Sequence, residues 1–502
     1  MKRRGKWTGL ALFAAWVGLL AACASGGTAV SDETAAPSAS AAEPYEVVMG
    51  FPVLGDVPKD LQQVEDAISK ITTDKIKAKV RLMAIPFGQW FQQSNLMLTG
   101  NDQLDVMLVD FSHYSEMVSA KRLTPLDELL ALHGQGIKDV LGYKLGVARV
   151  NGKIYTVPTN QLPLGGSAIY MRKDLFDQTG LDLNRVKSVD DLDRVFKAVK
   201  ESNPQIAVLA PNVQGAMPLT TAFAASGEYD SLLDGLGVVK NSDGGRKVVD
   251  WYETPEYSFA LKKLRSWYVA GYLPKNAATL RTNNTEQVKS GKAFALIDSD
   301  KPAAEKQQSA VVGREMVKVS LQPPLVTSAG VLGLTWAIPA HNSRNPAKAM
   351  EFLNLIYTDK DIVNLINFGI EGKHYVKKSE NVISILPGDG YRMRQSYMFG
   401  NAHLTYQTDT EDPKAREKGS AFEAAMAKSN TLGFTPDLDD VKTEVAAVKN
   451  VVAQYVPALE TGSVNPDKVL PQFIEKLKAA GIDKIIAEKQ KQLDAWLAAG
   501  RK

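Results

Sequence analysis

The sequence predicts an α/β fold, because β-rich runs alternate with stretches in which apolar residues recur at helical spacing. The first such runs are YEVVMG at 45–50, KVRLMAI at 79–85 and LDVMLV at 104–109. Strands that alternate with helices favour a parallel sheet built from right-handed βαβ units. The apolar fraction of 44% and the charged fraction of 23% are ordinary for a folded soluble protein. Such a composition argues against global disorder and against a polytopic membrane protein.

Charge and cysteine content exclude further classes. A net charge of +3 spread over 502 residues is not the concentrated basic face of a nucleic-acid-binding protein, so no nucleic-acid partner is predicted. The single Cys cannot form an internal disulfide, and it leaves no cysteine-based zinc site. The length is enough for a few domain-sized units with a core that needs no covalent staples.

The N-terminal residues predict an export signal. Four basic residues at positions 2, 3, 4 and 6 precede the apolar run Trp7–Ala22, which is shorter than the ~20 residues of a membrane-spanning helix. Residues 1–22 are therefore interpreted as a signal peptide. The run ends in Leu-Ala-Ala-Cys, which resembles the bacterial lipobox, and this resemblance implies that Cys23 is acylated, with palmitate among the chains. The alternative is a membrane anchor in which this Cys is incidental.

Residues 23–44 are interpreted as the lipidated Cys followed by a flexible tether. The segment ASGGTAVSDETAAPSASAAEP is small, polar and low in complexity, so it cannot bury enough apolar surface to offset its ordering entropy. As a flexible coil it would reach on the order of 25 Å, which would hold a folded body off a membrane.

The folded body begins at Tyr45. Apolar residues at helical spacing predict a helix over 59–76, and further helices are expected at Trp90–Leu98, 114–121 and 126–132. Ligands of parallel sheets bind at the carboxyl ends of the strands, so the residues just after the third strand, Asp110–Tyr114, are placed where a ligand could be met.

A second strand–helix region follows. We expect strands in NGKIYTVPTNQ at 151–161, at Gln205–Leu209, at Ala293–Ile297 and at Gly330–Ile338, and SAIYMRKDLF at 167–176 is expected to be a strand followed by a helix. A helix is expected at Asn345–Tyr357, with Pro346 in its first turn. The C-terminal part is expected to be helical, with a long helix that starts after Asn465-Pro466 and is broken at Gly481.

The order of these parts resembles the family 1 extracellular solute-binding proteins of ABC importers, over nearly the whole mature chain. It is similar, more closely, to the LipO-like subset of Gram-positive bacteria, which carries a characteristic C-terminal region. The segments that carry the resemblance, besides the lipobox, are LDVMLVDFSHYSEMVSAKRLTPLDELL, NGKIYTVPTN, AIYMRKDLF, VKSGKAFALI, SRNPAKAMEFLNLIYTD, NLINFGIEGKHYV, GYRMRQSYMFGN and the tail from NTLGFTPDLDDVKTEV to AAGIDKIIAEKQKQLDAW.

The resemblance implies a two-lobed periplasmic-binding-protein-like (type II) fold with a hinge and a helical C-terminal region. The N-terminal lobe would comprise 45–157 and 329–390, and the C-terminal lobe 158–328 and 391–502. The chain would cross between lobes near Pro158–Gln161, near Ala329–Ala337 and near 385–395. In such proteins the ligand adds contacts available only in the closed state and so shifts that population.

Motifs of catalysis and of metal binding are absent. The sequence contains no H-E-x-x-H, no G-x-S-x-G and no G-x-x-x-x-G-K-[ST]. Asn241, Asp243 and Glu253 do not have the offsets of a calcium loop. The acidic pair Asp190-Asp191 is interpreted as a helix cap, since carboxylates favour helix starts. We therefore predict neither an enzyme, nor a cofactor, nor a metal site.

A sugar site needs flat aromatic faces for the C–H surfaces of a pyranose ring and a few fixed polar groups for its hydroxyls. Each candidate could instead pack in the core, cap a helix or build a turn. Trp90 and Phe91 are expected to be core residues. The candidates for ligand contact, chosen because they lie at strand ends, at the presumed hinge or in QSYMFGN, are Phe111, Tyr114, Thr159, Asn160, Gln161, Asp298, Trp336, Tyr397 and Asn401.

These observations and the resemblance predict a solute-binding lipoprotein, anchored by lipid to the extracellular face of the cell membrane. It would capture a carbohydrate, and among carbohydrates an oligosaccharide, as a monomer, and deliver it to the permease subunits of an ABC transporter. Two alternatives remain open. One is a surface-anchored carbohydrate-active enzyme, and the other is a receptor that presents its ligand to a membrane sensor kinase.

Overall fold

A computed structural model describes residues 43–163, 166–212, 220, 228–321, 324–388, 390–393 and 395–500. Cys23, the predicted lipidation site, lies outside these residues. Pro44–Lys502 forms one compact unit. In the described part of the chain, none of the helices has the length and apolar character needed to cross a bilayer.

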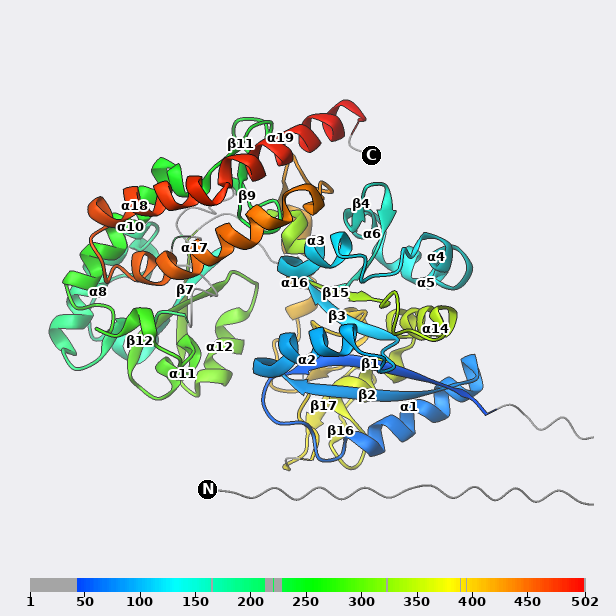
Figure 1. Cartoon of the computed structure of the whole chain (residues 1–502). Coiled ribbons are helices and arrows are strands. Elements are labelled where there is room, and N and C mark those ends of the chain that lie inside the picture. Colours follow the sequence, from blue (N-terminus) through cyan, green and yellow to red (C-terminus); the bar gives the residue numbers. More distant parts are fainter. Residues whose placement is uncertain are drawn as a thin grey trace, which may run out of the picture. The chain divides into compact units, whose positions relative to one another are not determined.

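The first sheet has five strands in the order β2-β1-β3-β15-β6. The three N-terminal strands are parallel to one another, and β15 runs antiparallel to both of its neighbours (Figure 1). The α/β prediction is thereby confirmed, with a mixed sheet in place of the expected parallel one. The strands are β1 (Tyr45–Val53), β2 (Ala78–Pro86), β3 (Val106–Asp110), β15 (Leu334–Ala337) and β6 (Val157–Pro158).

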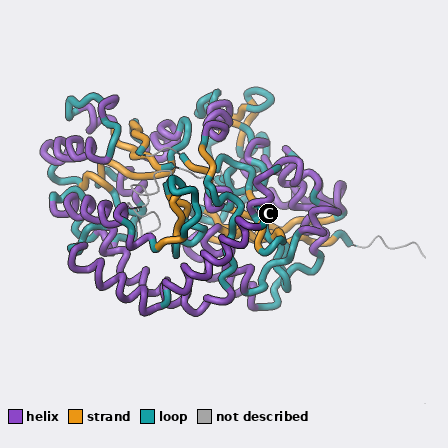
Figure 2. Tube along the Cα trace, turned by 90° about the horizontal axis from the view of Figure 1, so that it is seen from above, coloured by secondary structure: helices purple, strands orange, loops and turns teal. Residues whose placement is uncertain are grey.

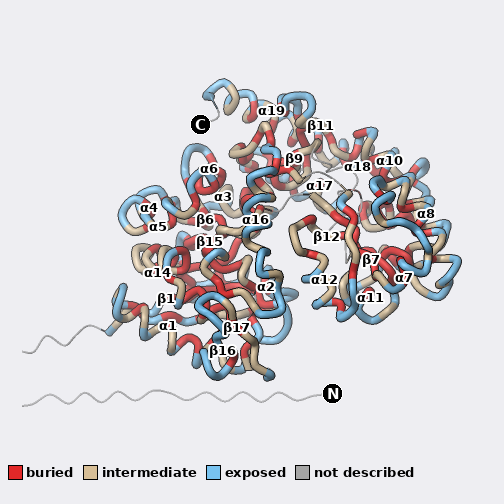
Figure 3. The backbone as a smooth tube through the Cα atoms, turned by 180° about the vertical axis from the view of Figure 1, so that it is seen from behind, coloured by how far each residue is buried: buried red, intermediate tan, exposed pale blue. Residues whose placement is uncertain are grey.

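Helices bury the faces of this sheet. Val64, Ile68 and Thr72 of α1 are buried at helical spacing, as the apolar pattern of 59–76 predicts. The helix α14 likewise buries Phe352 and Ile356. Both faces of the sheet are covered, which explains why β1 is buried along most of its length (Figure 3). The helices around this sheet are α1 (Leu61–Ile76), α2 (Phe87–Thr99), α3 (Phe111–Ser119), α4 (Asp127–His133), α5 (Gln135–Leu141), α6 (Tyr143–Val147), α13 (Ser328–Val331), α14 (Pro346–Thr358) and α15 (Lys360–Phe368).

The second sheet has four strands in the order β13-β7-β12-β8. Strand β7 lies between β13 and β12 and runs antiparallel to both. The predicted strands at 205–209 and 293–297 are confirmed as β8 and β12. The elements of this region are β7 (Ser167–Arg172), α7 (Lys173–Asp177), α8 (Val189–Ser202), β8 (Ala207–Leu209), α10 (Pro255–Val269), α11 (Asn284–Lys289), β12 (Ala293–Ser299), α12 (Ala304–Val312) and β13 (Met316–Ser320).

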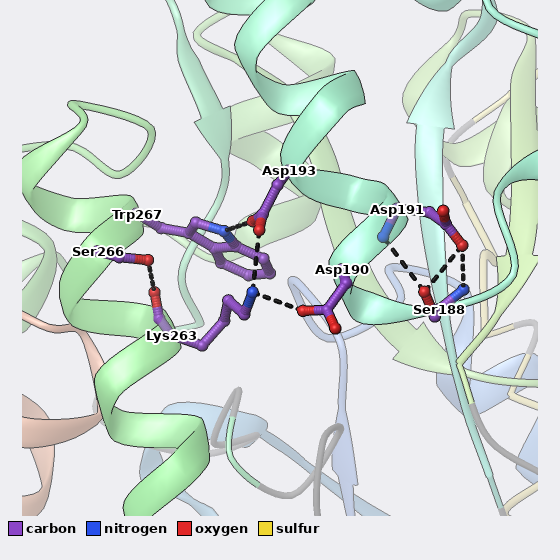
Figure 4. Close-up of polar contacts among 7 residues, drawn as sticks. All are labelled: Ser188, Asp190, Asp191, Asp193, Lys263, Ser266 and Trp267. Atoms are coloured by element: carbon purple, nitrogen blue, oxygen red, sulfur yellow. Dashed lines mark hydrogen bonds and ion pairs between the residues drawn. The ribbon is translucent and has the colours of Figure 1, made fainter.

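The start of α8 shows how a local sequence signal sets an element. Ser188 and Asp191 form a capping box, in which the Ser188 hydroxyl accepts a hydrogen bond from the Asp191 backbone at 3.2 Å. The interpretation of the acidic pair as a cap is confirmed. Lys263 of α10 then contacts the carboxylates of both Asp190 and Asp193, at 2.7 and 2.9 Å (Figure 4). These contacts hold α8 against α10.

Helices dominate the chain after residue 441, as predicted, and a helical segment leads to the C-terminus that is marked in Figure 2. The Asn465 side chain caps α18 by accepting a hydrogen bond from the Asp467 backbone at 2.9 Å. Gly481 ends that helix with a φ of 100°, a left-handed conformation that favours glycine. The three helices are α17 (Lys442–Glu460), α18 (Pro466–Ala480) and α19 (Ile482–Ala498).

Short elements complete the chain. A two-stranded parallel pair joins β14 to β19, and a three-stranded sheet has the order β16-β17-β18. The remaining elements, apart from single 3₁₀ turns, are β4 (Arg149–Val150), β5 (Lys153–Ile154), β9 (Tyr229–Asp230), β10 (Val238–Lys240), β11 (Val248–Val249), β14 (Leu325–Val326), β16 (Tyr375–Lys377), β17 (Val382–Ile385), β18 (Gln407–Thr408), α16 (Ala415–Ala425) and β19 (Ala427–Lys428).

Part of the segment predicted for the second lobe packs with the first core. Residues 391–502 are predicted for the second lobe, and Tyr391, Met398 and Phe399 of this segment are buried in the core of the first sheet. The Phe51 and Phe399 rings meet there at 4.9 Å. Leu432 still packs against this core, so the chain leaves the core only after that residue.

Asp437, just before α17, forms a set of hydrogen bonds that we call the tie at Asp437. Its carboxylate accepts a hydrogen bond from Ser119 of α3 at 2.9 Å and another from Asn151, between β4 and β5, at 2.7 Å. Its backbone nitrogen donates to the Gln492 side chain of α19 at 2.8 Å. One residue therefore joins elements of the first core to the C-terminal helices.

Candidate functional site

Trp336 lies on β15 and is fully buried. Its indole nitrogen donates a hydrogen bond to the Met398 carbonyl at 2.9 Å, and its ring stacks near Phe399 with a centroid distance of 5.9 Å. The expected stacking of Trp336 on a ligand is therefore corrected to core packing. Both faces of the sheet are covered where Trp336 lies, so its indole is enclosed by protein.

Tyr114 is also part of the core. The side chain is fully buried in α3, and its hydroxyl donates a hydrogen bond to the Ala148 carbonyl. Burial raises its pKa well above the ordinary value for tyrosine. The expected ligand contact is corrected here as well, because the helix turns this residue towards the sheet and away from the strand ends.

The segment after β6 is held by a polar clamp. The Asn160 backbone and side chain donate hydrogen bonds to the Gly400 carbonyl at 2.7 Å and to the Asn401 side chain at 3.0 Å. Gly400 has a φ of 52°, and a Cβ there would lie 2.0 Å from the Ile356 carbonyl oxygen, so glycine is required. Thr159, immediately before the clamp, is 3% exposed. This asparagine clamp, Asn160 with Asn401, positions the residues that follow it on each side.

Gln161 and Tyr397, two of the predicted ligand residues, line the same cavity. This hinge cavity has a volume of about 340 Å³ and is closed on its other side by Lys301 and Pro302, which follow β12. Ligand pockets typically measure about 300–1,000 Å³. The structure therefore brings a planar amide and a phenol from the first core opposite residues of the second sheet.

The lining of the hinge cavity includes the ionisable residues Lys301, His403, Glu411, Arg416 and Glu423. Burial, and next the positive charge of Lys144, lower the pKa of His403 below its usual value, so the ring is neutral at pH 7. Burial also lowers the pKa of Lys301 and raises that of Glu411. A neutral imidazole both donates and accepts hydrogen bonds, which suits an uncharged polyhydroxyl ligand.

Asp298 lies near the end of β12 and is not among the residues that line this cavity. Its carboxylate accepts hydrogen bonds from the Ser299 backbone at 2.6 Å and from the Gln308 side chain at 2.7 Å. Its negative charge acts on Lys301, which lines the cavity. The carboxylate thus has protein partners, and its predicted contact with a ligand stays a prediction.

The carboxyl ends of β2 and β3 carry an aromatic ledge that sequence reasoning missed. We define the aromatic ledge as Phe87, Phe91 and His113. Phe87 and Phe91 are 51% and 40% exposed, and the Phe91 ring stacks on His113 with a centroid distance of 4.5 Å. The prediction that Phe91 packs in the core was wrong, whereas Trp90 is buried as expected. The ledge could have been predicted from the connection between β2 and α2. Because α2 begins directly after β2, its first residues lie at the carboxyl end of that strand.

His113 is fixed in this ledge by Asp110. The imidazole Nδ1 lies 2.8 Å from the Asp110 carboxylate, which also accepts a hydrogen bond from the Ser112 backbone at 2.8 Å. Burial alone would raise the pKa of Asp110, but the contacts with His113 and Ser112 hold it below its usual value. The carboxylate therefore stays ionised and orients the ring that stacks on Phe91.

Phe111 lines a second cavity, which we call the α3–α17 cavity and which has a volume of about 450 Å³. Phe111 starts α3 and is partly exposed, and α17 supplies the opposite wall. Among the described residues, no group of three or more His, Cys, Asp or Glu side chains is placed to hold a metal ion.

Comparison with known proteins matches most of the chain. A family model described as bacterial extracellular solute-binding protein matches residues 63–362, and a domain of unknown function, DUF3502, matches residues 430–498. A Streptococcus pneumoniae protein named carbohydrate ABC transporter substrate-binding protein is 28% identical over 456 residues, which cover 88% of this chain and 90% of that protein.

Solved structures of one relative share the fold. The crystal structure of the N-glycan transport solute-binding protein NgtS from Streptococcus pneumoniae has 27% identity and a TM-score of 0.79, and the match covers 90% of this chain and 99% of that chain. The same protein in complex with Man5GlcNAc matches with 27% identity and a TM-score of 0.75, over 91% and 99% of the two chains. This likeness confirms the predicted two-lobed type II fold.

Proposed function

The chain belongs to the bacterial extracellular solute-binding proteins, and we propose that it captures a carbohydrate, specifically an oligosaccharide. The observation that carries this proposal is the aromatic ledge, whose rings are exposed at the carboxyl ends of β2 and β3. Ligands of such sheets bind at these strand ends. A relative with 27% identity over nearly its whole length is solved with an oligosaccharide, which supports the same ligand class here.

In this proposal the ledge accepts the apolar face of a sugar ring, and the hinge cavity supplies hydrogen bonds. Gln161 and Tyr397 offer an amide and a hydroxyl, and neutral His403 offers a donor and an acceptor. Asn160 and Asn401 position Gln161, and Thr159 precedes this clamp. Asp298 acts on Lys301 of the lining, and Phe111 lines the α3–α17 cavity. The two lobes close over the ligand, because the closed state adds contacts that only a bound sugar can make. The ligand leaves unchanged, without turnover.

We further propose that the protein acts on the outer face of the cell membrane. Residues 1–22 direct export, Cys23 carries acyl chains, and residues 24–44 tether the folded unit. Several acyl chains anchor stably where one is marginal, since each buried CH₂ contributes about 0.8 kcal/mol. The monomeric receptor then delivers its ligand to the permease subunits of an ABC transporter.

Calorimetric titration against a glycan panel that includes Man5GlcNAc tests the binding proposal. The wild type is expected to bind at least one oligosaccharide. Phe91→Ala is expected to weaken that binding about tenfold, since a lost central aromatic contact costs on the order of 1–2 kcal/mol. Phe259→Ala is the matched control, because Phe259 of α10 is 52% exposed and lines neither cavity.

Two results would contradict the proposal. The first is a wild-type protein that binds no saccharide but binds a peptide or an amino acid. The second is a steady release of reducing ends from the glycan during the titration, which would instead identify a carbohydrate-active enzyme.

A further inference from the structure

The α3–α17 cavity is built jointly by the first core and by the region that matches a domain of unknown function. Phe111 and Ser115 line it from α3, and Val445 and Ala446 line it from α17. Residues 430–498 match that domain, so they supply a whole wall of this cavity. Figure 1 shows α17 passing close to α3, and Lys449 of α17 lies 3.6 Å from the Glu116 carboxylate of α3.

Two buried polar atoms of the cavity lining have no hydrogen-bond partner among the residues that the structure describes. They are the Ser115 hydroxyl oxygen and one carboxylate oxygen, Oδ2, of Asp234. Ser115 is 6% exposed, and so is the Asp234 side chain. Nearly all buried polar atoms in proteins are hydrogen-bonded, because an unpartnered one costs about 1–3 kcal/mol. A ligand in the cavity would satisfy both atoms.

The other oxygen of Asp234 is fully occupied. It accepts a hydrogen bond from the Leu236 backbone at 2.8 Å and another from Lys489, which is 0% exposed on α19. Lys489 belongs to the same C-terminal domain and fixes the orientation of the carboxylate. The C-terminal domain therefore contributes both a wall of the cavity and the ion pair that orients the Asp234 carboxylate.

The rest of the lining combines apolar and polar side chains. Phe111 presents a partly exposed ring, and Leu438 and Val445 present aliphatic surface. The other charged side chains of the lining are Glu116, Asp439, Lys442 and Lys449. Apolar surface next to fixed polar groups is the general form of a site for a small polar organic molecule. A sugar unit matches both features, since its ring has an apolar C–H face and its rim has hydroxyls that donate and accept.

We propose that the α3–α17 cavity is a saccharide subsite, and that residues 430–498 serve to complete it. One sugar unit of the bound oligosaccharide lies between Phe111 and Val445. One of its hydroxyls donates to the free oxygen of Asp234, and another exchanges a hydrogen bond with Ser115. This inference rests on the carbohydrate-binding function proposed above and extends it to a region without an assigned role.

The first test blocks the cavity with Ala446→Trp. Ala446 is exposed on α17 and lines the cavity, so an indole there would fill the space without entering the core. The expected result is a loss of at least about tenfold in affinity for Man5GlcNAc by calorimetry, because the sugar unit can no longer enter. The matched control is Thr443→Trp, which places the same ring on an exposed position of the same helix, away from the cavity lining.

The second test removes one hydrogen-bonding group with Ser115→Ala. The hydroxyl has no described protein partner, so its removal is expected to leave the melting temperature unchanged or higher. The affinity for Man5GlcNAc is expected to fall about three- to tenfold, the range of one lost hydrogen bond. A purely structural serine would instead show a lower melting temperature and an unchanged affinity.

The outcomes separate the two proposals. A wild type that binds no glycan of the panel overturns the carbohydrate function, and the subsite with it. If the wild type, Ala446→Trp and Ser115→Ala all bind Man5GlcNAc equally well, the subsite proposal is overturned and the carbohydrate function stands. Weaker binding by both variants, with Thr443→Trp unchanged, is the result that the subsite requires.

Discussion

Trp336 sits at the centre of the first core, where its indole nitrogen donates to the Met398 carbonyl and its ring lies against Phe399. We expect Trp336→Ala to lower the free energy of unfolding by about 3–5 kcal/mol, the usual cost of deleting a large buried aromatic side chain. Urea denaturation followed by circular dichroism measures this change. Ligand affinity of the protein that remains folded is expected to be close to that of the wild type.

A more conservative substitution at the same position tests whether the loss of the buried ring causes the loss of stability. Trp336→Phe keeps a ring in the core but removes the indole N–H, so it should cost less than the alanine variant and still more than about 0.5 kcal/mol. A Trp336→Ala protein that keeps its full stability but no longer binds glycan would show that the ring contacts the ligand after all.

The site residues could be predicted from the sequence only where position in the chain determines exposure. Gln161 and Tyr397 lie on turns, and they line the hinge cavity. Tyr114 is buried and Phe91 is exposed, and the local sequence pattern does not reveal this difference. Successive residues on a helix are turned by about 100°, so Trp90 faces the core while Phe91 faces solvent. The rotation of α2 on its sheet, which decides between them, depends on long-range packing.

At the scale of elements, helix starts and stops were the most predictable features. Asn465, Pro346 and Gly481 act through hydrogen bonds or φ angles within a few residues, and the structure confirms each. The burial of the described residues in 391–399 was not predictable, because these residues lie in no helix or strand whose periodicity could mark a buried side. Tyr391, Met393, Met398 and Phe399 are buried because they pack against distant parts of the first core.

The end of α17 carries a buried acid whose charge state couples to stability. Burial raises the pKa of Glu460 to about 8, whereas a solvated glutamate titrates near 4.5. The folded protein therefore holds this proton between those pH values while the unfolded chain has lost it. Stability falls as the pH rises from about 4.5 to about 8, by up to ~1.4 kcal/mol per pH unit from this group, and levels off above that range. We expect Glu460→Gln to melt at a higher temperature than the wild type at pH 9 and at a similar temperature at pH 5.

Calorimetric melting temperatures at several pH values between 5 and 9 test this expectation. Glu475→Gln is the control, because Glu475 is an exposed residue of the adjacent α18. It should follow the wild-type curve throughout. A Glu460→Gln protein with the same pH profile as the wild type would mean that the buried carboxyl does not titrate in this range.

At the scale of the whole molecule, we expect Cys23→Ser to release the protein from the cell surface. Without its only thiol the chain cannot be acylated, so it loses the membrane affinity that the acyl chains would supply. Immunoblots of membrane and culture-medium fractions measure the redistribution. The released protein should bind glycan as well as the anchored form does.

Two results would argue against lipid anchoring. One is a Cys23→Ser protein that stays with the membrane, which would favour residues 7–22 as an uncleaved anchor. The other is a wild-type mature protein whose mass shows no added acyl chains.

The asparagine clamp and the tie at Asp437 together constrain how the lobes can move. The clamp joins Asn160 to Asn401, and the tie joins Asp437 to Ser119 and Asn151. The proposed closure must preserve both sets of contacts or break them. Replacing Asp437 would free the segment before α17 from α3 and from the turn between β4 and β5, and would therefore loosen the coupling between the first core and the C-terminal helices.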